Sequence, residues 1–434
     1  MKEDTKHTKN RALIIFGTIS SLIGDEIASV AISIWVAMQT DNPMSFAFVY
    51  SIQKFSRIFF SLFSGSIIDA VNKKKILYLT DFVQCILNIA MLVVMVSALS
   101  FHLKVLVFCA ISGVQGFCLS LFKPASRAIL PEIIADEKLQ QTNSILEVSK
   151  TIVSTLSVLF AGALVLLFGV FVCIIINAVS FFISGLSEVL ITYEFQKSEK
   201  QKLKTSKFQS IIDGYKYVLN NHTLLLLAVI AATMNFIGTP IFSNILTYQY
   251  KEIFHSGLLT SFFHFAVLQN EQSFITMIST MMFFAVGIAS VVGGIFAGKE
   301  RKVNMLLLVI GLVMLSFFVM FAYFVGMTSS SLLMRFEVLV GVIIVVSALY
   351  GVSMGAFNVY ITTLYQRIVD RKFMGRFFAF NTILMQLASP ISMMLVSAFV
   401  SRTNNFNLVY CFAFVISLLL FVVVKSFGMA VIEN

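Results

Sequence analysis

Apolar runs of roughly twenty residues, separated by shorter polar interruptions, recur along the whole chain. A helix needs about 20 residues to cross the hydrocarbon core of a bilayer, because each residue adds about 1.5 Å. The pattern therefore predicts an all-α membrane protein with twelve transmembrane helices. We expect these spans at 12–38, 45–69, 76–99, 104–122, 145–167, 170–191, 224–249, 272–297, 304–326, 336–362, 377–400 and 408–425.

The composition excludes a soluble globular protein. Of the 434 residues, 58% are hydrophobic and only 12% are charged, whereas soluble domains carry about 25% charged residues. The net charge of +10 is dispersed between the apolar runs, so we expect the lipid bilayer and a small-molecule substrate as partners and no nucleic acid. The chain has no phosphate-binding loop, serine-nucleophile elbow or HExxH pair, and its five cysteines lack metal-site spacing. We therefore predict no enzyme activity, no metal and no cofactor.

The distribution of basic residues predicts the orientation in the membrane. Most of the 31 Lys and Arg residues lie in alternate interruptions, beginning with the N-terminal segment. By the positive-inside rule these interruptions are cytoplasmic. Both termini are therefore expected in the cytoplasm, as an even number of spans requires.

The longest charged interruption divides the chain into two halves. It covers 192–223 and separates an N-terminal bundle, 1–191, from a C-terminal bundle, 224–434, each with six spans. Within it an apolar stripe recurs at helical spacing and predicts a helix lying along the membrane surface, the alternative being a solvated linker. The stripe consists of Phe208, Ile211, Ile212, Tyr215 and Leu219.

Two cytoplasmic interruptions repeat with nearly constant offset. The segment 65–75 after the second span matches 294–302 after the eighth, and 136–143 before the fifth span matches 370–376 before the eleventh. Both members of each pair face the same side. The halves are therefore predicted to be parallel repeats, the arrangement of transporters with six plus six spans.

Specific residues also resemble a known family. Gly65-x-x-x-Asp69 followed by Lys73, Lys74 and Lys75 resembles the signature loop of the major facilitator superfamily. The segments 122–143, 213–218 and 375–390 are similar to its drug:proton antiporter branch, which includes macrolide efflux proteins. The resemblance implies alternating access by two six-helix bundles in the bacterial plasma membrane, working as a monomer. It also implies export of hydrophobic or cationic compounds, such as macrolide-like drugs, with the proton gradient as energy source.

Two alternatives to drug export stay open. Exporters of amphipathic lipids or siderophores are built alike. The chain also departs from the family pattern, with Ala70 and Asn72 in the signature loop and Ser157-Val158 where antiporters carry Gly-Pro. These departures would fit a non-transporting membrane receptor or immunity protein.

Four charged residues fall near the middle of predicted spans: Asp25 and Glu26 in the first, and Lys54 and Arg57 in the second. An ionisable group at that depth costs roughly 2.5–3.5 kcal/mol, so such residues are candidates for function. We predict that one acid, preferably Asp25, faces the cavity and exchanges a proton, while the other pairs with Arg57 or Lys54. The alternative is a static salt-bridged cluster that holds the two spans together.

The family arrangement also predicts a cytoplasmic gate and a substrate cavity. Asp69, preceded by Gly65, is expected to approach the start of the eleventh span near Gly375 and Arg376, where a helix N-terminus favours an anion by roughly 0.3–1 kcal/mol. Lys73, Lys74 and Lys75 either belong to this gate or only anchor the loop on the positive side. The cavity is expected between spans one, four, seven and ten, where interior polar or aromatic residues either contact an amphipathic substrate or bond between helices. These residues are Trp35, Gln115, Asn235, Tyr350 and Asn358.

Overall fold

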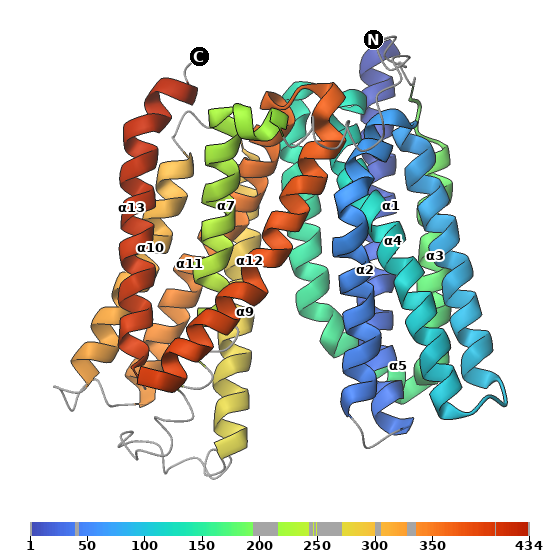
Figure 1. Cartoon of the computed structure of the whole chain (residues 1–434), viewed down its shortest axis with the longest axis horizontal. Helices are drawn as coiled ribbons and strands as arrows, with labels where there is room; N and C mark the ends of the chain where they lie inside the picture. Colours follow the sequence, from blue (N-terminus) through green and yellow to red (C-terminus); the bar gives the residue numbers. More distant parts are fainter. Residues whose placement is uncertain are drawn as a thin grey trace. The chain divides into compact units, whose positions relative to one another are not determined.

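The computed structural model of the chain is built of long helices, as the apolar pattern predicts (Figure 1). The structure describes residues 2–39, 43–193, 216–242, 246, 249, 271–299, 305–327, 336–403 and 405–432. Within these residues, ten segments are long and apolar enough to cross a membrane. The all-helical membrane fold is confirmed.

Every predicted span overlaps a helix. The helices are α1 (Lys2–Gln39), α2 (Pro43–Ala70), α3 (Lys73–Val96), α4 (Phe101–Ile133), α5 (Asp136–Val189), α7 (His222–Pro240), α9 (Glu271–Gly298), α10 (Met305–Met327), α11 (Phe336–Ile368), α12 (Met374–Thr403) and α13 (Phe406–Ile432), with a short 3₁₀ helix, η5 (Arg371–Phe373), before α12.

Helix α5 contains two predicted spans. It is 54 residues long, and at Gly169 the backbone leaves the helical conformation, with φ 80° and ψ 168°. Only glycine adopts such a conformation without a steric penalty, because it lacks Cβ. Gly169 therefore separates the predicted spans 145–167 and 170–191 without an intervening loop.

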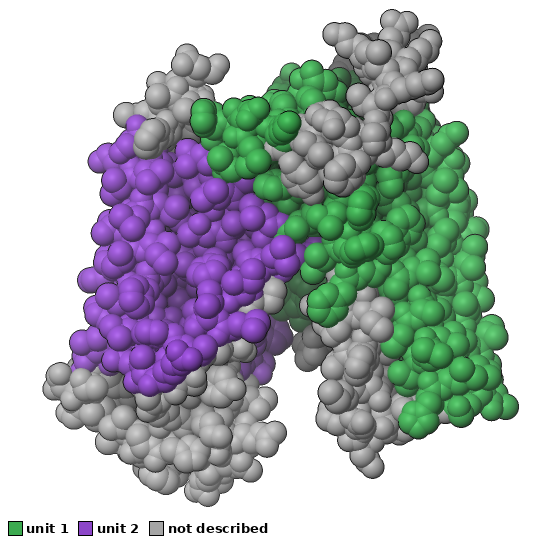
Figure 2. Space-filling model, in the orientation of Figure 1, with its two compact units in different colours: residues 1–225, 363–383 green, residues 226–362, 384–434 purple. Residues whose placement is uncertain are grey.

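The chain forms two compact units. Unit 1 comprises residues 1–225 and 363–383, and unit 2 comprises 226–362 and 384–434 (Figure 2). The first ten residues of α12 thus belong to unit 1 and the remainder to unit 2. The domain boundaries predicted from the charged interruption stay a prediction. Most of that interruption, 194–215, lies outside the described residues; Leu219 of its apolar stripe is 53% exposed.

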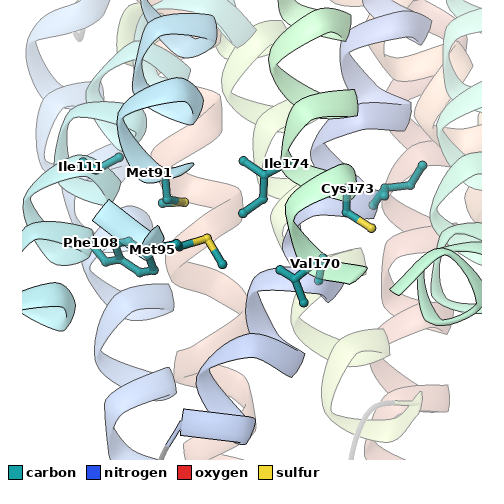
Figure 3. Close-up of a cluster of buried hydrophobic side chains, with 9 residues drawn as sticks. Met91, Met95, Phe108, Ile111, Val170, Cys173 and Ile174 are labelled. Atoms are coloured by element: carbon teal, nitrogen blue, oxygen red, sulfur yellow. The ribbon is translucent and has the colours of Figure 1, made fainter. Parts of the chain in front are cut away.

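The core of unit 1 is formed where α3, α4 and α5 meet α1. Side chains from α3, α4 and α5 converge in Figure 3, including Met91, Phe108 and Ile174, which are at most 1% exposed. Exposed apolar side chains such as Ile86 and Val93 lie elsewhere on α3. In a membrane protein that outer surface is in contact with lipid.

Small residues bring α1 close to the second segment of α5. Gly17 and Gly24 are buried on one face of α1. A Cβ added at Gly17 would overlap the hydroxyl of Ser187, and one added at Gly24 would overlap that of Ser180. Such small-residue contacts let helix backbones approach within membranes, where no hydrophobic force drives association. These contacts fix the rotation of α1 about its axis. They thereby also fix the direction of Asp25, the residue after Gly24.

Unit 2 also contains close helix contacts at glycine residues, and it has an aromatic core. Cβ atoms at Gly293 or Gly355 would overlap backbone atoms of the facing helix, so α9 and α11 pack closely. The ring of Tyr350 stacks on Phe242 with centroids 4.0 Å apart.

Candidate functional site

The acidic pair of α1 lies among cations from neighbouring helices. Asp25 is half-buried and interacts electrostatically with Lys123 of α4 and Arg57 of α2. Glu26 interacts with Lys123 and with Lys150 of α5. We call these five residues the inner charge cluster. It joins α1, α2, α4 and α5 of unit 1.

Lys123 and Lys150 were not among the predicted site residues. Lys123 directly follows the predicted span 104–122 but still belongs to α4, which continues for eleven residues beyond that span. Lys150 lies one turn inside the fifth span and forms an ion pair with Glu147 at 3.3 Å. Both lysine side chains are exposed rather than packed in the core. A charged side chain on a membrane-spanning helix is tolerated where it faces a water-filled space.

The attraction between Asp25 and its cationic neighbours depends on the charge of Asp25. While Asp25 is ionised it attracts Lys123 and Arg57, which belong to two other helices. Protonation of Asp25 removes that attraction. The predicted partner Lys54 lies on α2, but its side chain is outside the described residues.

Asp69, at the end of α2, holds the beginning of α12. Its Oδ1 accepts a hydrogen bond from the backbone N–H of Gly375 at 2.8 Å, and its Oδ2 accepts one from that of Arg376 at 3.3 Å. The guanidinium Nε of Arg376 lies 3.1 Å from Oδ2. The first turn of α12 has no acidic residue of its own, so Asp69 provides the negative charge that a helix N-terminus favours. The structure thus brings together Asp69 and Arg376.

Two glycines make this contact possible. A Cβ at Gly65 would lie 2.5 Å from the Cα of Arg376, and one at Gly375 would lie 2.6 Å from Oδ1 of Asp69. Both distances are shorter than any stable contact of a Cβ atom. The spacing Gly65-x-x-x-Asp69 therefore places a contact surface and a capping carboxylate on one face of α2.

The three lysines after Asp69 differ in their surroundings. Lys73 is buried and its Nζ contacts Oε1 of Glu132 at 2.9 Å, while the hydroxyl of Tyr193 donates to Oε2 at 2.6 Å. Burial and the neighbouring Glu132 carboxylate raise the pKa of Tyr193, so its hydroxyl stays protonated as a donor. Lys74 is half-buried and Lys75 is exposed. Of the three, only Lys73 has an ion pair in the described structure.

A second contact of unit 1 was not predicted from the charges. The amide of Asn143 on α5 donates to Oγ1 of Thr363 at 2.9 Å and to Oε1 of Gln366 at 2.6 Å, both on α11. Gln366 in turn donates to the carbonyl of Arg127 at 2.9 Å. Asn143, Thr363 and Gln366 are at most 5% exposed. The neutral amides gave no charge signal, although Asn143 belongs to a segment that resembles the antiporter branch.

The residues predicted to line the cavity have different surroundings. Asn235 bonds to Ala231 of its own helix and to Met385 of α12, and Tyr350 is buried among aromatic rings. Gln115 is buried and Asn358 is half-buried. The side chain of Trp35 lies outside the described residues. A role of these residues in substrate binding stays a prediction.

The chain is similar in sequence and in fold to known proteins. Residues 14–270 match the family model described as Major Facilitator Superfamily. A relative from Bacillus subtilis (strain 168), an uncharacterized MFS-type transporter called YvqJ, is 26% identical over 123 residues. That alignment covers 27% of this chain and 29% of the relative, so the chain spans less than a third of the relative's length.

Two solved structures share the fold over nearly their whole length. A bacterial homologue of the iron transporter ferroportin, in an outward-facing state, has a TM-score of 0.70 and 17% identity, covering 97% of this chain and 99% of that one. The proton:xylose symporter XylE has a TM-score of 0.65 and 11% identity, covering 98% and 96%. At these identities the likeness concerns the fold alone.

Proposed function

The chain belongs to the Major Facilitator Superfamily, and we propose that it exports hydrophobic or cationic small molecules in exchange for protons. It is a multi-pass membrane transporter and not an enzyme. In the proposal it acts as a monomer in a bacterial plasma membrane, with both termini in the cytoplasm. Macrolide-like drugs are the substrates that its sequence resemblance favours.

The observation that carries this proposal is the position of Asp25. It is an acid on a membrane-spanning helix whose cationic electrostatic partners, Lys123 and Arg57, lie on two different helices. In the proposal, a proton on Asp25 releases both cations and weakens the attraction between α1 and its neighbours. Loss of the proton restores the attraction. A change in protonation is thereby converted into a change in helix packing.

The Asp69 contact acts as the cytoplasmic gate in this scheme. Opening it requires breaking two hydrogen bonds to a carboxylate and one ion pair. Hydrogen bonds to charged groups contribute about 1.5–3 kcal/mol each. The free energy of proton entry has to offset this cost, and each charge that crosses the field supplies about 2.3 kcal/mol per 100 mV.

The substrate class rests on the sequence resemblance rather than on the fold. The two similar structures belong to an iron transporter homologue and a sugar symporter, so one fold serves very different substrates. Export of an amphipathic lipid or siderophore is the alternative that the apolar composition also favours. A receptor without transport activity is the alternative that the altered signature loop favours.

Accumulation measurements test the proposal. Cells with and without the protein are exposed to a panel of macrolides and fluorescent hydrophobic cations, before and after a protonophore collapses the proton gradient. We expect lower accumulation of at least one compound in cells with the protein, and recovery after the collapse. Equal accumulation of every compound in both cell types would overturn drug export and favour lipid movement or the receptor.

A further inference from the structure

A second pair of acids lies in unit 1, away from the inner charge cluster. Asp81 of α3 is 1% exposed and Glu188 of α5 is 0% exposed. The ring of Phe82 fills the space beside Gly185, where a Cβ would lie 2.9 Å from the ring. The two helices therefore approach closely at the level of these acids, and the carboxyl groups interact with each other.

The oxygen atoms of this pair lack the partners that buried carboxylates require. Oδ2 of Asp81 and both carboxyl oxygens of Glu188 are buried without a hydrogen bond. The same is true of Oε1 of Gln84. The hydroxyl of Ser184 lies beside the Asp81 carboxyl and interacts with it. Gln84 and Ser184 are themselves 3% and 0% exposed. The site thus gathers oxygen atoms with free lone pairs from two helices.

No cation compensates the pair within the described part of the chain. Besides Glu188 and Ser184 of α5, the residues that act on Asp81 from other helices are Asp25 of α1 and Cys118 of α4, neither of which is cationic. Two ionised carboxylates buried together would each cost several kcal/mol and would repel one another. A bound positive charge removes both penalties.

We propose that Asp81 and Glu188 form a second proton site, in which one proton is shared between the two carboxyl groups. Among the described residues, no group of three or more His, Cys, Asp and Glu side chains comes together as a multivalent metal ion requires. A single shared proton needs only the two carboxyls. The free oxygens of Ser184 and Gln84 then accept or relay hydrogen bonds from the protonated group.

Polar side chains of α3 and α5 also lie beside α1 next to Asp25. Ser180 donates to the carbonyl of Asn177 at 2.8 Å, and the amide of Asn177 donates to Asn88 at 3.1 Å. A Cβ at Gly24 would lie 2.8 Å from Oδ1 of Asn177. These side chains therefore reach α1 at the residue directly before Asp25.

The two proton sites oppose one another electrostatically. A negative charge on Asp25 disfavours a negative charge on Asp81, because like charges in a low-dielectric interior repel. Release of a proton from Asp25 therefore strengthens the hold of the pair on its shared proton. Glu188 is one residue from the end of α5, on the side that the sequence predicts to be cytoplasmic. The coupling between the two sites rests on the proposed proton exchange at Asp25, whereas the shared proton of Asp81 and Glu188 does not.

Infrared spectroscopy of the purified protein in lipid nanodiscs tests the shared proton. Protonated carboxyl groups give a C=O stretching band that carboxylates lack. At neutral pH we expect this band in the wild-type protein and its loss in Asp81→Asn/Glu188→Gln. Asp25→Asn removes the acid that is proposed to exchange the transported proton, and in this variant we expect the band of Asp81 and Glu188 to persist. If the double variant does not fold, Asp81→Asn and Glu188→Gln are measured singly. Each is expected to shift the frequency of the band, because the remaining acid no longer shares its proton with a second carboxyl.

Three results would overturn the shared proton. These are absence of the band from the wild type at neutral pH, an unchanged band in the neutral variants, and removal of the band by Na⁺ or Ca²⁺, which would make the pair a metal site. A failure of the transport proposal gives a different result. In that case Asp25→Asn transports normally, while the infrared band of Asp81 and Glu188 persists.

Discussion

The carboxylate of Asp69 lies 2.8 Å from the backbone nitrogen of Gly375, a residue 306 positions later in the chain. A side chain at the end of α2 thus caps the N-terminus of α12. The contact is buried, since the Asp69 side chain has no exposed surface. Burial makes its hydrogen bonds expensive to lose, because no water replaces the lost partner.

The close approach at Gly65 predicts a specific sensitivity to size. Gly65→Ala places a methyl group 2.5 Å from the Cα of Arg376, so α12 has to move. We expect destabilisation of about 1–3 kcal/mol, the usual cost of overpacking, measured as a lower thermal unfolding midpoint. Gly341→Ala is the matched control, because a Cβ there meets no atom within 4 Å. Equal midpoints for the two variants would contradict the close contact.

The ion pair of the gate predicts a measurable coupling between two residues. In a double-mutant cycle of Asp69→Asn and Arg376→Gln, we expect a coupling free energy of about 0.5–3 kcal/mol in thermal stability. Lys372 and Asp370 form the control pair, because their charged atoms also lie 3.1 Å apart while both side chains are more than half exposed. That pair should couple by about 1 kcal/mol or less. If the coupling free energy of Asp69 and Arg376 is no larger than that of the exposed pair, their ion pair does not stabilise the closed gate.

The Asn143 contact predicts an effect of losing hydrogen-bond donors alone. Asn143→Asp keeps the shape but removes the N–H donors to Thr363 and Gln366, and it places a carboxylate beside the acceptor of Gln366. We expect a loss of about 1–3 kcal/mol in stability. At Asn405 only the side-chain oxygen is used, as an acceptor from Leu408, so Asn405→Asp should leave the unfolding midpoint unchanged. The prediction is wrong if both substitutions are tolerated alike.

Tyr193 predicts how stability changes at alkaline pH. Burial and the Glu132 carboxylate raise the pKa of Tyr193 in the folded protein above its ordinary value of about 10. The resulting stabilisation is complete below pH about 10 and is lost as the pH rises further, because the unfolded chain releases the proton first. The stability of Tyr193→Phe should therefore fall less steeply than that of the wild type above this pH. Parallel curves would show that the phenol does not contribute in this way.

The helices were predictable because a bilayer demands long apolar segments. Even the join between the fifth and sixth spans is visible, since Gly169 stands between two predicted runs. The ends were less visible where polar residues continue a helix. α4 runs to Ile133, eleven residues beyond the predicted span, and for this reason Lys123 was not recognised as part of the charge cluster.

Contacts between distant segments were predictable only where a family resemblance supplied the packing. The resemblance led from Asp69 to Gly375 and Arg376, whereas the amide contacts of Asn143 carry no charge signal. Asp81 and Glu188 are visible as acids in apolar runs. Their meeting depends on how α3 packs against α5, which residue spacing along one helix does not determine.

Transport by Asp25→Asn tests the proposed proton coupling at Asp25 most directly. This substitution keeps the shape of the side chain and removes its exchangeable proton. Efflux of a compound found in the accumulation panel is measured in cells with equal membrane amounts of the variant and the wild-type protein, with and without a proton gradient. We expect gradient-dependent efflux by the wild type and none by Asp25→Asn. Undiminished gradient-dependent efflux by the variant would contradict the proposed coupling.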